Sequence, residues 1–290
     1  CLNKNLINQI TLQPMERFNL DAAIIFSDIL MLPYGLGQKV EFKKNFGPFL
    51  GNLNINNFLK VNEEDFVNKL KPVYEGLNIT SKSKLIKNKD LIGFVGAPWT
   101  ILIYMLNKKS PKKIISKDLF KDENLINNLF KIIEKFLKIH IKNQINNGAS
   151  IIQIFDSWAG LVDKKNLEKY VYNPTLNLVE YVKSFKIPVI CFPRNIKNYK
   201  EYCEKVLPDA INIDYEIDPK KIAKEIKIPV QGGLDPKILL TDKNNLIKKT
   251  NYYLNIFKDH PYIFNLGHGV LPETKPETIE YVIQTIRSKK

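Results

Sequence analysis

The sequence predicts an α/β protein, a (β/α)8 barrel of the TIM-barrel type, and two observations favour this fold. Short apolar runs rich in β-branched residues alternate with longer amphipathic runs along all 290 residues, as in right-handed βαβ units around a parallel sheet. Polar residues follow the apolar runs, which is where such a barrel carries its functional side chains. We therefore expect one barrel domain spanning residues 1–290.

Seven short runs are candidates for strands. They are Ala22–Phe26, Leu91–Val95, Ser150–Phe155, Val189–Phe192, Ala210–Ile213, Val230–Gln231 and Tyr262–Asn265. A closed barrel of this type needs eight strands. The chain begins with Cys1 instead of Met, and its next residues already have a helical pattern. We therefore expect the first strand of the barrel to belong to an N-terminal segment that precedes Cys1.

Amphipathic runs between these strands indicate the outer helices. The clearest is Asn124–Asn147, where apolar residues recur at helical spacing. The other helical runs are Leu167–Ser184, Lys197–Val206, Pro219–Glu225, Asp242–Phe257 and Pro276–Ser288. The least regular stretch is Gly47–Ser83, which we expect to be a long excursion with a short helix around Glu64–Leu70.

A doubly wound open sheet is the alternative that this alternation allows. Such a sheet usually carries a glycine-rich phosphate turn after an early strand. The sequence contains neither G-x-G-x-x-G nor G-x-x-x-x-G-K-[ST], and Gly35-Leu-Gly37 lacks the third glycine. A barrel instead predicts polar residues after strands along the whole chain. These residues are Asp28, Thr100, Asp156, Ser157, Arg194, Asp214, Gln231 and His268, and they favour the barrel.

The charge and the cysteines limit the class of partner and the compartment. The net charge of +14 would suit a polyanion, but the lysines are spread along helical runs without an arginine cluster. We therefore expect a solvated lysine surface and no nucleic-acid partner. No apolar stretch approaches the ~18–20 residues of a membrane-spanning helix, so no membrane association is expected. Cys1, Cys191 and Cys203 form no disulfide framework, which predicts a cytoplasmic location.

Asp28 interrupts one of the most apolar stretches, in which Phe26-Ser-Asp28 is followed at once by Ile29-Leu-Met-Leu. A carboxylate at the end of a buried strand is costly unless a partner uses it. One interpretation is a turn aspartate that accepts backbone N–H groups. The other is a catalytic carboxylate at the mouth of the barrel.

His268 lies between two glycines in Asn265-Leu-Gly-His-Gly269. These glycines permit a positive φ and a close approach of a ligand to the backbone. Histidine is also the side chain that titrates near neutral pH, so His268 is either a binding residue or a turn histidine without a partner. His140, inside a helical run, and His260, beside Pro261, are expected to be structural or solvated.

Ser157 and Tyr104 also follow strands. Ser157 lies in Phe155-Asp-Ser-Trp, which is no G-x-S-x-G elbow, so we expect it to donate a hydrogen bond to substrate and not to act as a nucleophile. Tyr104 comes about one turn into a helix after Pro98, and it either reaches the mouth or packs as an ordinary rim tyrosine. The cysteines and histidines have no metal-ligand spacing. We therefore expect no metal and no other cofactor.

Taken together, five segments resemble the uroporphyrinogen decarboxylase family of haem biosynthesis. They are TLQPMERFNLDAAIIFSDIL (11–30), GFVGAPWTILIYM (93–105), IFDSWAGL (154–161), VQGGLDP (230–236) and NLGHGVLPET (265–274). They occur in the order of the family and cover nearly the full length. The first and last segments are long enough to be highly specific.

The resemblance implies a (β/α)8 barrel that works as a homodimer. It implies that the protein removes the four acetate carboxyl groups of uroporphyrinogen III as CO2, giving coproporphyrinogen III without a cofactor. Carried over onto this sequence, Asp28 is the central carboxylate of the cleft. Tyr104, Ser157 and His268 are then substrate-binding residues.

The sequence also departs from the family. An opening arginine motif of the R-Q-A-G-R-Y kind is absent, Tyr215 stands where tryptophan is common, and Gly233 stands in place of the asparagine of QGNLDP. Two other functions are compatible with the barrel: a corrinoid-linked methyltransferase and a non-catalytic tetrapyrrole-binding relative. The first needs a zinc site, for which no ligand spacing is present, and the second does not require a buried carboxylate.

Overall fold

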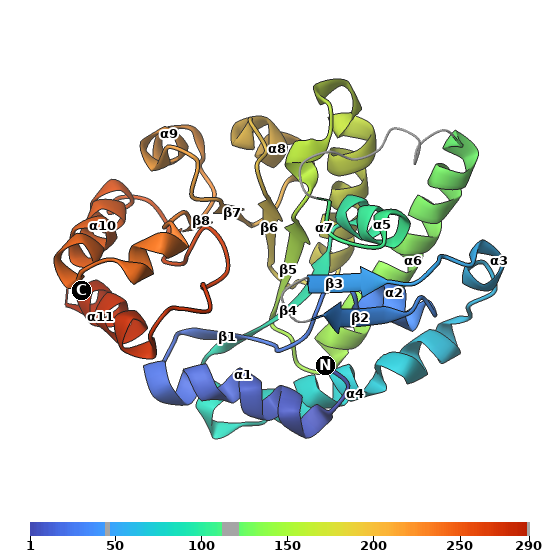
Figure 1. Ribbon diagram of the computed structural model, residues 1–290. Coiled ribbons are helices and arrows are strands. Elements are labelled where there is room, and N and C mark those ends of the chain that lie inside the picture. The colour runs from blue at the N-terminus through green and yellow to red at the C-terminus, as the bar shows by residue number, and fades with distance from the viewer. Residues whose placement is uncertain (44–46, 112–121, 289–290) are drawn as a thin grey trace.

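The computed structural model describes residues 1–43, 47–111 and 122–288. Its core is a curled sheet of seven parallel strands, in the order β1-β4-β5-β6-β7-β8-β9 (Figure 1). The strands are β1 (Ala22–Ile24), β4 (Asp90–Gly96), β5 (Ile151–Asp156), β6 (Val189–Pro193), β7 (Ala210–Ile213), β8 (Val230–Gly232) and β9 (Tyr262–Ile263). All seven predicted strands are confirmed. Each strand pairs in parallel with the next strand of this sheet, as βαβ connections require.

Helices surround the curled sheet on its outer side (Figure 1). They are α1 (Lys4–Phe18), α2 (Met31–Gly35), α3 (Ile55–Phe58), α4 (Glu63–Ser81), α5 (Pro98–Asn107), α6 (Glu123–Asn146), α7 (Asn173–Lys183), α8 (Tyr199–Val206), α9 (Pro219–Glu225), α10 (Lys243–Ile256) and α11 (Pro276–Arg287). Short helical turns are η1 (Lys84–Ile86), η3 (Ala159–Leu161), η4 (Lys164–Asn166) and η6 (Pro236–Leu240), and η5 (Glu168–Tyr172) is a π-helix that leads into α7.

The prediction for Gly47–Ser83 is wrong in part. The stretch begins with β3 (Gly47–Leu50), which pairs antiparallel with β2 (Val40–Lys43), and it contains the 19-residue helix α4 instead of a short helix. The Asn62 side chain caps α4 by accepting the N–H of Asp65 at 2.8 Å. Phe66, Leu70, Val73 and Leu77 recur at helical spacing and are buried, so packing carries the helix past Pro72.

A polar layer crosses the interior of the curled sheet. The amide of Gln231 on β8 donates to Asn212 on β7 at 2.7 Å and to Gln153 on β5 at 3.4 Å. β5 and β8 are separated in the sheet by β6 and β7. The contact between them therefore spans the concave side, which identifies Gln153, Asn212 and Gln231 as residues that face the interior.

Aromatic rings lie on the interior face at the carboxyl ends of the strands. Side chains alternate along a strand, so Phe155 shares the interior face with Gln153. The Phe155 ring contacts Phe94 on β4 at 5.5 Å and Phe192 on β6 at 6.2 Å between centroids, both edge to face. These three rings form an apolar floor beneath the loops that follow the strands.

β1 and β9 are the edge strands of the described sheet, and they do not pair with each other. Ile24 and Ile263 lie in register with Ile92 and with the interior-facing Gln231, respectively. They are 45% and 43% exposed, and Phe26, just beyond β1, is 40% exposed. The apolar interior is therefore uncovered on the side where the two edge strands face each other.

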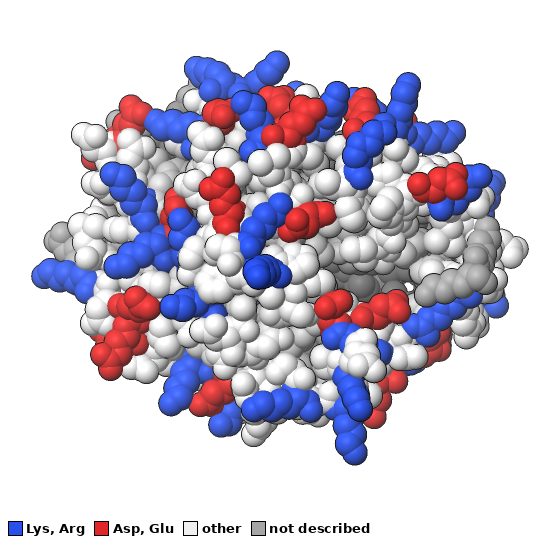
Figure 2. All heavy atoms as spheres, turned by 180° about the vertical axis from the view of Figure 1, so that it is seen from behind, with Lys and Arg blue, Asp and Glu red and all other residues white. Residues whose placement is uncertain are grey.

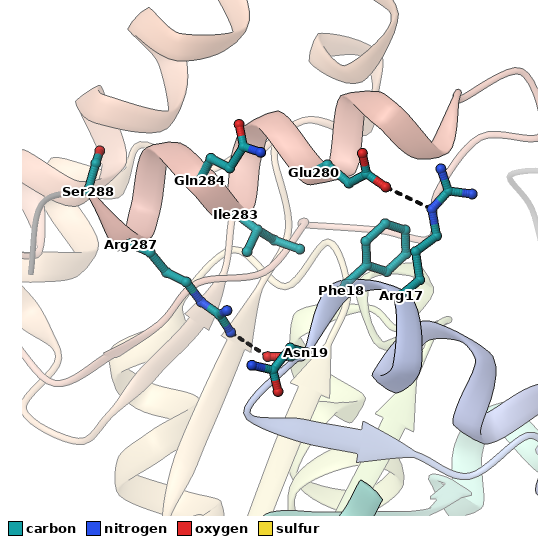
Figure 3. A pocket seen from close by; sticks show the side chains of 8 residues that line it. All are labelled: Arg17, Phe18, Asn19, Glu280, Ile283, Gln284, Arg287 and Ser288. Atoms are coloured by element: carbon teal, nitrogen blue, oxygen red, sulfur yellow. Dashed lines mark hydrogen bonds and ion pairs between the residues drawn. The ribbon is translucent and has the colours of Figure 1, made fainter.

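The C-terminal end of α1 contacts α11 (Figure 3). The Arg17 guanidinium binds Glu277 at 2.9 Å and Glu280 at 2.8 Å, and Arg287 donates to the backbone carbonyl of Asn19. The Phe18 ring lies between Arg17 and Ile283 in the same view. These contacts fasten the C-terminal helix beside β1.

The face shown in Figure 2 agrees with the predicted distribution of lysines. On the face shown in Figure 2, Lys and Arg side chains are scattered and interspersed with Asp and Glu, without a continuous basic stripe. A continuous basic patch is the usual electrostatic footprint of a nucleic-acid-binding protein. No helix in the described part of the chain is long and apolar enough to cross a membrane.

Candidate active site

Asp28 lies in the turn between β1 and α2, at the carboxyl end of the sheet. One carboxylate oxygen accepts the N–H of Leu30 at 2.7 Å, and the Asp28 carbonyl accepts the N–H of Met31 at 3.1 Å. A Cβ added to Gly96, the last residue of β4, would lie 3.2 Å from Ile29, so this turn packs directly on the end of β4. Burial raises the pKa of Asp28 above its usual value, and the hydrogen bond from Leu30 opposes that rise.

Tyr104 reaches the same region from α5. Its side chain is 9% exposed, its hydroxyl lies 3.2 Å from Ser110 Oγ, and its ring packs on Trp158 at 5.8 Å between centroids. Burial raises the pKa of Tyr104, the negative charge of Asp28 raises it further, and the positive charge of Arg194 lowers it. Tyr104 therefore lies within electrostatic reach of both charged groups and remains a neutral hydrogen-bond donor at pH 7.

Ser157 directly follows β5 and is half-buried. The turn that holds it is fixed from below: Asp156 Oδ1 accepts from Thr100 Oγ1 at 2.6 Å, and Thr100 Oγ1 accepts the N–H of Trp158 at 3.1 Å. These bonds join the end of β5 to α5. Ser157 and Tyr104 are thus positioned by the same two elements.

Asp156 is a fully buried carboxyl group beside Ser157. It is 1% exposed, and its Oδ2 atom has no hydrogen-bond partner among the described residues. Burial raises its pKa from 3.8 to about 7, against the hydrogen bonds from Thr100 and the Trp158 backbone. The folded protein therefore holds the Asp156 proton over a pH range in which the unfolded chain releases it.

This difference predicts a pH-dependent stability with a definite sign. Between about pH 4 and pH 7 the folded state binds more protons than the unfolded state, so the free energy of unfolding should fall as the pH rises, by on the order of a few kcal/mol in total. Asp156→Asn cannot titrate and should remove this contribution. Urea unfolding of both proteins at pH 5 and pH 8 measures it, and two parallel pH profiles would contradict it.

His268 lies in the loop after β9, where it is exposed. Its Nδ1 atom accepts the N–H of Gly269 at 2.6 Å, so a neutral ring carries its proton on Nε2. Partial burial of the ring lowers the pKa of His268, the charge of Arg194 lowers it further, and Asp214 raises it. His268 is therefore mainly neutral at pH 7, with an Nε2–H donor.

The glycines around His268 differ from the prediction in one respect: neither adopts a positive φ. A Cβ on Gly267 would lie only 2.4 Å from the backbone nitrogen of Tyr215, whereas a Cβ on Gly269 would have no atom within 4 Å. The first glycine therefore permits a close approach between this loop and the Asp214–Tyr215 turn that follows β7. That packing positions the His268 loop.

The remaining histidines have structural partners. His140 is 3% exposed, its Nδ1 lies 3.0 Å from the Tyr74 hydroxyl, and burial lowers its pKa to about 3. The ring of His260 contacts the backbone carbonyls of Ile226 and Pro261, each at 3.0 Å. Within residues 1–43, 47–111 and 122–288, no group of three His, Cys, Asp or Glu side chains could hold a metal ion.

The structure thus places the four predicted site residues after β1, β4, β5 and β9. The charge of Asp28 raises the pKa of Tyr104. The Asp156–Thr100 hydrogen bond joins the two elements that carry Ser157 and Tyr104. The charge of Arg194 lowers the pKa of both Tyr104 and His268. The sequence indicates Arg194 only as a strand-end residue, and the structure adds the effect of its charge on Tyr104 and His268. The arrangement offers one carboxylate, hydroxyl donors, a neutral imidazole and one guanidinium above an apolar floor.

Comparison with known proteins identifies the family of the chain. Residues 1–289 match the model of the family described as uroporphyrinogen decarboxylase (URO-D). The chain is 40% identical to uroporphyrinogen decarboxylase of Rickettsia bellii over 293 aligned positions, covering 99% of this chain and 86% of the relative. It is 38% identical to uroporphyrinogen decarboxylase of Wolbachia pipientis, covering 99% of this chain and 85% of that protein.

Among solved structures, a methyltransferase from Methanosarcina mazei is similar with a TM-score of 0.83, covering 99% of this chain and 86% of that chain. The two sequences are only 15% identical, so this likeness concerns the fold alone. The family model and the relatives that match 99% of the chain identify the family, which the likeness in fold alone does not. The chain therefore belongs to the uroporphyrinogen decarboxylase family.

Proposed function

We propose that this protein converts uroporphyrinogen III to coproporphyrinogen III by removing the four acetate carboxyl groups as CO2, with no cofactor. The observation that carries the proposal is the half-buried carboxylate of Asp28 at the mouth of the sheet, in a chain that belongs to this family. Tyr104, Ser157 and His268, which follow other strands of the same sheet, would supply polar contacts for a substrate rich in carboxylates.

The chemistry requires an electron sink. When a pyrrole ring carbon gains a proton, the ring becomes cationic, and the bond between the acetate methylene and its carboxylate breaks towards the ring. CO2 leaves, the methylene carbon gains a proton to become a methyl group, and the ring carbon loses its proton. The net reaction consumes one proton and releases one CO2 for each acetate.

Asp28 would lower the barrier by stabilising the cationic ring. Its carboxylate accepts hydrogen bonds from the pyrrole N–H groups, and its negative charge is already in place when positive charge develops on the ring. Because the group is partly withdrawn from water, its attraction to the ring is screened less than it would be in water. The carboxylate must be ionised for this role, so activity should be lost as the pH falls through its raised pKa.

Tyr104, Ser157 and His268 would orient the substrate. Tyr104 and Ser157 offer hydroxyl donors, and His268 offers Nε2–H, to the acetate and propionate groups around the tetrapyrrole. Each contact is one among several, so the loss of one should weaken binding more than it slows the chemical step.

The direct test is CO2 release from uroporphyrinogen by the purified full-length protein, followed by identification of the product. We expect four CO2 per substrate and undiminished turnover after exhaustive chelation. An absence of CO2 release would refute the proposed function. Activity that disappears on chelation and returns with one added metal would refute the cofactor-free mechanism.

The proposal also concerns the architecture of the domain. A single domain over residues 1–290, together with a strand from residues preceding Cys1, would form a closed eight-stranded barrel. The exposed apolar residues Ile24, Phe26 and Ile263 between the two sheet edges support this closure. Hydrogen exchange in β1 and β9 should then slow when the preceding residues are present, and unchanged exchange would contradict it.

The protein would also work as a homodimer in the cytoplasm. Family membership supports the dimer, and the free thiols of Cys1, Cys191 and Cys203 suit a reducing compartment. Sedimentation at micromolar concentration measures the assembly. A purely monomeric active enzyme would contradict it.

A further inference from the structure

We propose that Arg194 binds a carboxylate of the tetrapyrrole at the edge of the site, as the guanidinium clamp supplied by this part of the chain. The inference rests on the proposed function, because it assigns a further residue to the same substrate. It follows from the position of Arg194, from the absence of a partner for its charge among the residues that the structure describes, and from its electrostatic effect on Tyr104 and His268.

The backbone of Arg194 is held on both sides. Its N–H donates to the Asp156 carbonyl at 3.0 Å, and its carbonyl accepts the N–H of Gly160 at 3.1 Å. The next residue, Asn195, has a φ of 58° and donates its N–H to Asp214 Oδ2 at 2.8 Å. The backbone of Arg194 is therefore fixed between the ends of β5 and β7.

Because side chains alternate along a strand, Arg194 lies on the concave side of the sheet. β6 pairs with β5 such that Ile190 lies opposite Gln153, and Phe192 lies opposite Phe155. Gln153 and Phe155 face the interior, so Ile190 and Phe192 face it too, and Arg194 continues the same alternation just beyond β6. By the same register, Arg194 follows Phe192 as Ser157 follows Phe155.

The guanidinium has no partner in the described part of the protein. Its Nε atom is buried without a hydrogen bond, and no described carboxylate lies within ion-pair distance of it. The carboxylate of Asp214 is already engaged, because it accepts the N–H groups of Asn195 and Glu216 and the hydroxyl of Tyr199. The other arginines of the chain, Arg17 and Arg287, each bind an oxygen partner.

A cation that is partly withdrawn from water and unpaired is unfavourable, and an anionic ligand would relieve it. The charge of Arg194 lowers the pKa of both Tyr104 and His268, so it acts on the space between them. A guanidinium binds a carboxylate through two parallel N–H bonds, which fixes the orientation of the carboxylate as well as its position. The substrate offers such groups around its whole rim, whereas the pyrrole N–H groups at its centre suit Asp28.

The test compares Arg194→Met, Arg194→Lys and a control, Arg17→Met, which removes the same charge at the α1–α11 contact. For CO2 release, Arg194→Met should raise KM about 10- to 100-fold, the usual effect of losing a hydrogen bond to a charged group, with little change in kcat. Arg194→Lys should fall between it and the wild type, because the charge stays and the bidentate geometry is lost. Arg17→Met should keep the normal KM.

Stability separates binding from a structural role. Because Arg194 has no partner among the described residues, Arg194→Met should keep or raise the melting temperature of the free protein, whereas a structural arginine would lower it. A normal KM in Arg194→Met, at any melting temperature, would overturn the assignment. So would a fall in kcat with KM unchanged.

Failure of the proposed function gives a different result. If the wild type releases no CO2, titration with uroporphyrin, a fluorescent octacarboxylate, still decides the role of Arg194. Weaker binding by Arg194→Met than by Arg17→Met would support a carboxylate site. Equal binding by the two variants would overturn it.

Discussion

Asp28→Asn should lower the rate of CO2 release by about 10²–10³-fold, the usual loss when one preorganised electrostatic partner of a transition state is removed. Asparagine keeps the shape of the side chain, and its carbonyl oxygen can still accept the N–H of Leu30. It carries no charge, so it cannot neutralise a cationic pyrrole in a site where burial already raises the pKa of the carboxyl. The measurement is kcat with uroporphyrinogen at saturating concentration.

Matched variants separate charge from position. Asp28→Glu keeps the charge but moves it by one methylene, so it should retain more activity than Asp28→Asn. Tyr104→Phe, Ser157→Ala and His268→Ala each remove one polar contact among several, and each should cost only about 1–3 kcal/mol of transition-state stabilisation.

Thermal unfolding of the same proteins is the control for Asp28. If the aspartate only organises the turn before α2, its removal should cost about 0.5–2 kcal/mol of folding free energy and leave turnover unchanged. Normal turnover in Asp28→Asn together with a lower melting temperature would therefore show that the residue is structural, and the mechanism would be wrong.

The strands could be predicted from the sequence because two signals coincide in each of them. Residues 189–193 are apolar and mostly β-branched or aromatic, and they are buried on both faces between two neighbouring strands. The stretch Gly47–Ser83 was harder, because Pro72 and the polar faces of α4 obscure the spacing of Phe66, Leu70, Val73 and Leu77. Helix α4 is stabilised by packing against α1, α2 and α6, which no local pattern contains.

The candidate site likewise contains residues that the sequence locates and residues whose role depends on the three-dimensional structure. Asp28 and Ser157 could be located because each directly follows an apolar run, and in a barrel the ends of all strands meet at one mouth. Arg194 follows a strand too, but its significance is that no described carboxylate pairs with it, which depends on residues far apart in the chain. Likewise, the sequence indicated that glycines flank His268, but only the structure shows which of them touches another backbone.

The difference between Gly267 and Gly269 is the basis of the second large effect that we predict. Gly267→Ala should destabilise the protein by about 1–3 kcal/mol and disturb the His268 loop, because the new Cβ would lie 2.4 Å from the Tyr215 nitrogen and 2.8 Å from the Asp214 carbonyl carbon. Backbone atoms cannot move aside as the end of a flexible side chain can. The Gly267 N–H also donates to Leu234 at 2.8 Å, so the loop is held from its other side.

Gly269→Ala is the matched control, two residues away in the same loop. Its Cβ would meet no atom within 4 Å and its φ is not positive, so its free energy of unfolding should stay within about 0.5 kcal/mol of the wild type. In Gly267→Ala alone, KM should rise at least as much as in His268→Ala, because the displaced loop carries the imidazole away from the substrate. Urea unfolding and steady-state kinetics on both variants measure these effects. Equal behaviour of the two variants would mean that the contact between the His268 loop and the turn after β7 does not position the histidine.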